Sequence, residues 1–210
     1  MIFLWLFIYS AAMAYLESAV VVYLRWLYYP DGFALTLNPI PFQSLVVEIA
    51  REMATIIMLL SVAFLSGRNK AQRAAIFIFC FGVWDIFYYV WLKVLLDWPA
   101  GLLDWDVLFL IPAVWVGPVL APVLVSLGLI GVGVLIYHFD RQRKPVCPTW
   151  AECLLMLTGC GIIIVSFIVQ SGSGLSDLSQ IRYPWWMFIA GYIISLTGVI
   201  MTAIRIKMNG

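Results

Sequence analysis

The sequence is poor in charge, in histidine and in paired cysteines. Charged residues make up 11% of the 210 residues and the net charge is +1, whereas a soluble domain carries about 25% charged residues. A hydrophobic share of 64% and a mean hydropathy of +1.02 exclude a soluble enzyme. The balanced charge gives no strongly basic surface for nucleic acid. One histidine and four cysteines without a CxxC pair exclude the usual zinc, haem and disulfide frameworks.

Long apolar runs fill most of the chain instead. About 20 apolar residues are needed for a helix that crosses the hydrocarbon core of a bilayer. No run shows the alternation of a membrane β-strand, so helices are the spanning elements that satisfy the backbone. The sequence predicts an all-α membrane protein with one domain over residues 1–210 and six spans, at about 2–29, 44–66, 74–97, 105–137, 151–170 and 185–204.

The first apolar run has one feature of a cleaved signal peptide. Ala11, Ala12 and Ala14 resemble a small-residue cleavage site. No basic segment precedes them, however, and the run continues to Leu24. We therefore expect this run to remain as the first span.

Basic residues are concentrated in alternate connections. Eight of them lie in 67–73, 138–149 and the C-terminal tail, and the opposite connections contain Arg182 alone. Because cytoplasmic loops carry an excess of lysine and arginine, this pattern predicts that both termini face the cytoplasm. We expect a multi-pass protein of the inner (cytoplasmic) membrane, with Asp97 and Asp106 at outer helix ends.

The fourth run is too long for a simple span. Trp105–Tyr137 would measure about 50 Å as a straight helix, and Pro112, Pro118 and Pro122 interrupt it. We predict an outer piece that lies in the interface or re-enters the membrane, followed by a span from about Val119. A long tilted helix with kinks is the alternative. On a helix, Ala113, Gly117 and Ala121 would form a small-residue stripe against which another helix could pack.

Seven ionisable residues lie within the first three spans. Each costs at least about 2.5–3.5 kcal/mol at the centre of a bilayer, so these side chains should turn toward a shared interior. Glu48, Arg51 and Glu52 are spaced i, i+3, i+4 and share one helix face. The residues predicted to bind a substrate or ion are Glu17, Glu48, Arg51, Glu52, Asp85, Tyr89, Lys93 and Arg25.

Glu48 and Glu52 are the most informative pair. Two carboxylates one helical turn apart repel each other in a low dielectric, and coupled pairs of this kind hold or shuttle a proton. Binding of both by Arg51 or Arg25 would relieve the repulsion and make the cluster a structural network. A carboxylate-only site for a hard cation, built from Glu17, Glu48, Glu52 and Asp85, also stays open.

Three functions fit these patterns. The first is a small carrier, coupled to protons or cations, with its acidic and basic cluster open to the outer side. The second is a non-catalytic subunit of a larger membrane complex. The third is an intramembrane enzyme acting on a lipid or isoprenoid, which the sequence favours least because no nucleophile has an identifiable partner. We expect no metal or other cofactor. The expected partners are the lipid bilayer and either other membrane subunits or further copies of the chain.

Overall fold

The structure is a computed structural model that describes residues 1–28, 42–111, 113–144, 146–169 and 182–208. The described residues form six helices and one two-stranded β-hairpin. The helices are α1 (Ile2–Tyr28), α2 (Phe42–Ser66), α3 (Lys70–Leu96), α4 (Leu120–Arg141), α5 (Trp150–Ile168) and α6 (Trp185–Met208), and the strands are β1 (Trp105–Phe109) and β2 (Trp115–Pro118).

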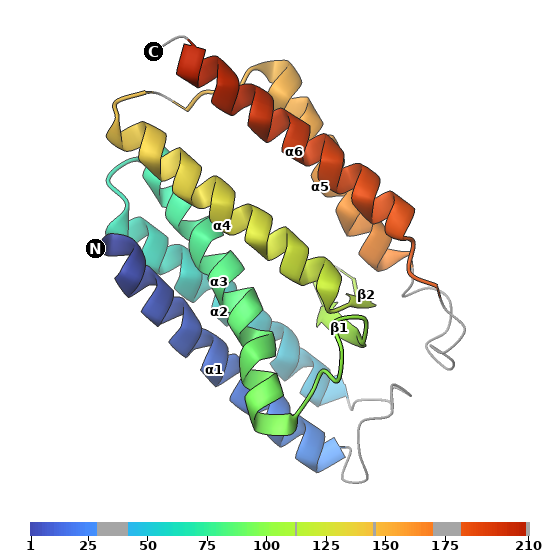
Figure 1. The fold of residues 1–210 in the computed structure, drawn as a ribbon. Helices are drawn as coiled ribbons and strands as arrows, with labels where there is room; N and C mark the ends of the chain where they lie inside the picture. Colours follow the sequence, from blue (N-terminus) through green and yellow to red (C-terminus); the bar gives the residue numbers. More distant parts are fainter. Residues whose placement is uncertain (29–41, 112, 145, 170–181, 209–210) are drawn as a thin grey trace.

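The helices run alternately in opposite directions, so that α1 begins and α6 ends at the same end of the molecule (Figure 1). Helix α3 is central to the first four helices, since it packs against α1, α2 and α4. Helices α5 and α6 pack extensively against each other and touch α4 only sparingly. The connections rich in lysine and arginine, 67–73 and 138–149, lie at the end where the chain begins.

Five of the six helices are long and apolar enough to cross a membrane. They are α1, α3, α4, α5 and α6, so the chain has the character of a multi-pass, membrane-embedded protein. Helix α2 is not among the five. It is 25 residues long and carries the charged residues Glu48, Arg51 and Glu52. The prediction of a sixth span therefore stays a prediction.

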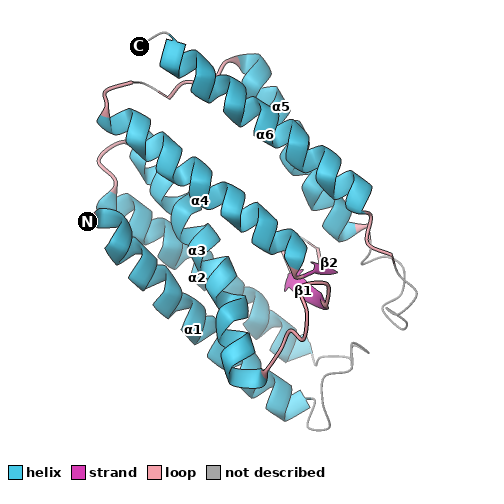
Figure 2. Ribbon diagram, viewed as in Figure 1, coloured by secondary structure: helices cyan, strands magenta, loops and turns pink. Residues whose placement is uncertain are grey.

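The prediction of a fourth helical span that begins at Trp105 is wrong. Residues Trp105–Phe109 and Trp115–Pro118 form an antiparallel hairpin, so the protein is not purely α-helical (Figure 2). The predicted break is confirmed, because α4 begins at Leu120. Two prolines explain why α4 begins at Leu120. Pro118 ends β2, and Pro122 lies in the first turn of α4, where a backbone N–H would have no helical acceptor.

The small-residue stripe predicted for this run is also not formed. Gly117 lies on β2 and Ala121 on α4, so the two do not share a helical face with Ala113. Gly117 serves a different contact, because a Cβ atom there would lie 3.0 Å from the ring of Phe167. The absence of a side chain thus lets the hairpin lie against α5.

Glycines bring α5 and α6 together. A Cβ atom on Gly159 would lie 2.5 Å from the carbonyl oxygen of Gly191 on α6, whereas one on Gly161 would have no described atom within 4 Å. We expect Gly159→Ala to destabilise the protein by about 1–3 kcal/mol through overpacking. Gly161→Ala is the matched control, and we expect it to be neutral or slightly stabilising because alanine favours helix. Thermal unfolding in detergent compares them, and equal effects would contradict this account of the interface.

Candidate functional site

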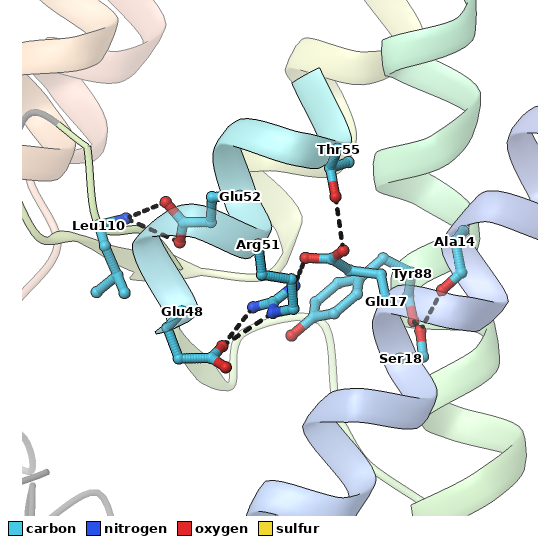
Figure 3. Close-up of polar contacts among 9 residues, drawn as sticks. All are labelled: Ala14, Glu17, Ser18, Glu48, Arg51, Glu52, Thr55, Tyr88 and Leu110. Carbon is cyan, nitrogen blue, oxygen red and sulfur yellow. Dashed lines mark hydrogen bonds and ion pairs between the residues drawn. The ribbon is translucent and has the colours of Figure 1, made fainter. Parts of the chain in front are cut away.

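Arg51 connects two carboxylates in the bundle (Figure 3). Its Nε and Nη2 atoms donate to Glu48 Oε2, at 2.9 and 2.6 Å, and its Nη1 atom forms an ion pair with Glu17 of α1. Thr55 donates a further hydrogen bond of 2.9 Å to Glu17. One base therefore pairs with two acids, which fixes α1 against α2.

Glu52 has a different partner from its neighbour Glu48. Both of its carboxylate oxygens lie 3.1 Å from the backbone nitrogen of Leu110, which donates to them (Figure 3). Leu110 directly follows β1. Glu52 thus holds the hairpin against α2 through a neutral donor, and among the described residues it forms no ion pair with a base.

Two further carboxylates lie near these groups, the half-buried Asp85 of α3 and the buried Asp106 of β1. Ser126 of α4 donates a hydrogen bond of 2.7 Å to Asp85 of α3. Tyr89, one turn further along α3, interacts electrostatically with Asp106 of β1. The Asp106 side chain is 4% exposed, and its Oδ2 atom has no hydrogen-bond partner in the described part of the chain.

Several of these polar groups line one small cavity. Its walls come from α1, α2, α3 and β1, and its volume is about 50 Å³. A water molecule needs at least about 10–15 Å³ of such space, so the cavity has room for a few waters and none for an organic solute. The lining residues are Glu17, Arg51, Glu52, Trp84, Asp85, Tyr88, Tyr89, Val107, Leu108 and Phe109.

The eight predicted site residues do not all lie together. Five of the eight line the cavity, and Glu48 is tied to them through Arg51. Arg25 lies over the ring of Trp98, 4.0 Å from its centre, and acts electrostatically on Asp106. Lys93 is not part of the cluster. Its side chain is 49% exposed and pairs with Asp97 at 2.7 Å, an interaction that lowers the pKa of the Asp97 carboxyl.

Asp106 is the residue that sequence reasoning missed. We expected it at the outer end of a helix, but the structure buries it in the hairpin beside Tyr89. The helical interpretation of 105–137 concealed the strand β1, in which Asp106 is the one buried residue. The signal that could have identified it is the spacing of Pro112 and Pro118, which is incompatible with one continuous helix.

The carboxylate-only metal site is not formed by the described residues. No three histidine, cysteine, aspartate or glutamate side chains in that part of the chain lie close enough together to hold a metal ion. The acids are instead distributed over separate hydrogen-bond donors. Their arrangement suits the holding of protons and ordered water better than the coordination of a metal.

No protein-family model, curated protein or solved structure matches this chain. The functional argument therefore rests on the geometry of the cavity. Carboxylates that face a few waters in a low dielectric can exchange a proton with one another through those waters.

Proposed function

We propose that this protein is a small membrane carrier and that the species it moves is a proton. The observation that carries the proposal is the shared cavity, into which Glu17 of α1, Glu52 of α2 and Asp85 of α3 project. Ionisable residues within membrane helices mark ion and proton pathways because burying them is costly.

The hydrogen-bond partners support a proton over a larger solute. Arg51 forms ion pairs with Glu17 and Glu48, whereas Glu52 and Asp85 accept from an amide and a hydroxyl. A carboxyl group with only neutral partners can gain or lose a proton without breaking an ion pair. The cavity also has no room for an organic substrate.

The buried hydroxyl of Ser10 adds a polar group to α1 outside the cavity. Ser10 of α1 is fully buried, and its Oγ atom has no hydrogen-bond partner among the described residues. It lies about two helical turns from Glu17, toward the basic end of the bundle. In the proposed function it belongs to the route by which the proton leaves the cavity.

The proposed location is the inner (cytoplasmic) membrane, with both termini in the cytoplasm. The support is the distribution of basic residues, because the connections 67–73 and 138–149 and the end of α6 lie together at one end of the bundle.

Reconstitution into liposomes tests the proposal. We expect the purified protein to dissipate an imposed pH gradient, followed by a pH-sensitive dye trapped inside, and Asp85→Asn to reduce this flux to the level of protein-free liposomes. Asparagine can still accept from Ser126, so the fold is kept. The control is Asp97→Asn, which removes a carboxylate from the exposed end of α3. A wild-type flux equal to that of empty liposomes refutes the proposal.

A structural subunit is the second candidate. It is favoured by Arg51, because one base that pairs with acids on two helices fixes how those helices pack. Purification in a mild detergent separates the candidates. A subunit co-purifies with stoichiometric partners and shows no proton flux alone, whereas a carrier is active as the isolated chain.

A further inference from the structure

We propose a second binding site, independent of the proton site: one acyl chain of an anionic phospholipid lies in the crevice between α4 and the α5–α6 pair. In this arrangement the phosphate of the lipid lies against the basic connection from α4 to α5. The juxtaposition of an apolar crevice with cations at one end of it that form no ion pair with a described residue carries the proposal.

The crevice is apolar along its walls. Thr202 is its only polar lining residue, and the Thr202 hydroxyl donates to the carbonyl of Gly198 within α6. The enclosed volume is about 50 Å³, as small as that of the polar cavity, so the crevice takes up a few methylene groups of one chain rather than a whole ligand, and it excludes a ring system or a helix. The lining residues are Val132, Leu135, Ile136, Phe139, Val146, Pro148, Met156, Val199, Thr202, Ala203 and Ile206.

Direct packing does not close the crevice. Helix α4 packs along its length against α3, but it touches α6 at few positions. The α5–α6 pair therefore stands partly apart from the first four helices (Figure 1). In a membrane, such a crevice faces the acyl chains of the surrounding lipid, which are its natural apolar occupant.

The basic connection lies at one end of the crevice. Phe139 and Val146 both line the crevice, and Arg141, Arg143 and Lys144 lie between them in the chain. None of these three bases forms an ion pair with a described residue. They are therefore available to an anion at the membrane surface.

The acids nearest to this connection are already engaged. Asp140 accepts hydrogen bonds from the side chains of Asn69 and Gln72, at 3.0 and 2.6 Å. Glu152 pairs with Arg205 of α6 at 2.9 Å. The donors to Asp140 are neutral, so its carboxylate keeps its charge, but Arg141, Arg143 and Lys144 outnumber it three to one. The connection therefore keeps a net positive charge, which complements an anionic headgroup.

Hydrogen bonds hold this connection beside the crevice. Arg205 Nη2 donates to the carbonyl of Cys147 at 2.6 Å, which ties the connection to α6. The backbone nitrogen of Lys144 donates to the carbonyl of Phe139 at 3.1 Å, which turns the chain back toward α4. The phosphate position is therefore adjacent to the end of the apolar channel, as a phospholipid requires.

Lipid binding to the purified protein tests this site. We expect native mass spectrometry with added phosphatidylglycerol or phosphatidylcholine to show preferential retention of the anionic lipid. The double variant Arg143→Gln/Lys144→Gln should lose roughly tenfold or more of this preference, because two charges near the headgroup are removed. The matched control is Arg68→Gln/Lys70→Gln, which removes two charges from the start of α3 and the connection before it, a segment that contributes no residue to the lining of the crevice.

A second variant tests the acyl-chain position. Ala203→Phe fills the crevice, and we expect it to reduce retention of both lipids while leaving the headgroup preference in place. Equal loss of preference in the two double variants overturns the proposal, since the cations would then act without regard to position. Retention of a second copy of the chain in place of lipid, seen as a dimer mass, also overturns it. The Arg143→Gln/Lys144→Gln variant alters an exposed connection, so it tests the proposal even if Ala203→Phe does not fold.

Discussion

Replacing Arg51 with glutamine is expected to destabilise the protein by about 3–5 kcal/mol. The change removes the base that pairs with both Glu17 and Glu48, and it leaves two carboxylates buried without a cation. The cost is that of an uncompensated buried charge rather than of one lost hydrogen bond. Chemical unfolding in detergent micelles, followed by tryptophan fluorescence, measures the change.

The control for this experiment is Lys93→Gln. Lys93 also pairs with an acid one turn away, but that pair is exposed, and we expect no measurable effect on unfolding. Adding Glu17→Gln to Arg51→Gln should restore part of the lost stability, because one unpaired charge is removed. If Arg51→Gln unfolds at the same denaturant concentration as the wild type, Arg51 does not hold α1 and α2 together.

Replacing Glu52 with glutamine is expected to abolish proton flux while the protein stays folded. Glutamine keeps a carbonyl oxygen that can accept from the Leu110 N–H, so the hairpin remains anchored to α2. It cannot take up or release a proton. In liposomes we therefore expect the flux to fall to the level without protein, with an unfolding midpoint close to that of the wild type.

Glu52→Ala separates the two roles of this carboxylate. Alanine removes both the titratable group and the acceptor for Leu110. We therefore expect loss of flux together with a free energy of unfolding that is lower by about 1–3 kcal/mol. Asp97→Asn again serves as the control with full flux. Normal flux in Glu52→Gln would show that this carboxylate only anchors the hairpin, and it would remove Glu52 from the proposed pathway.

Much of the candidate site could be predicted from single helices. The spacing of Glu48, Arg51 and Glu52 placed them on one face of α2, and the structure brings that face against α1 and α3. The polar side of α1 is likewise buried at Ser10, Glu17 and Ser18. These side chains lie in the interior because an ionisable side chain on a helix with apolar surroundings has few alternatives to the protein interior.

Two helix starts have local capping residues, which the span predictions, made from the apolar runs, did not use. Asn69 caps α3 by accepting from the backbone nitrogen of Gln72, and Thr149 and Glu152 form a reciprocal capping box at the start of α5. These residue types satisfy free N–H groups at helix starts wherever they occur. The structure begins both helices within four residues of the predicted positions.

By itself, the sequence determined the membrane character of this protein, the approximate course of its helices and the burial of its charges, because hydrophobicity and helical periodicity are properties of each segment alone. The tertiary structure decided which acid takes which partner. Arg51 reaches Glu17 and Glu48, and a hairpin after α3 supplies the amide for Glu52 and buries Asp106. Such pairings depend on distances between segments that are remote in the chain, and spacing along one helix does not encode those distances.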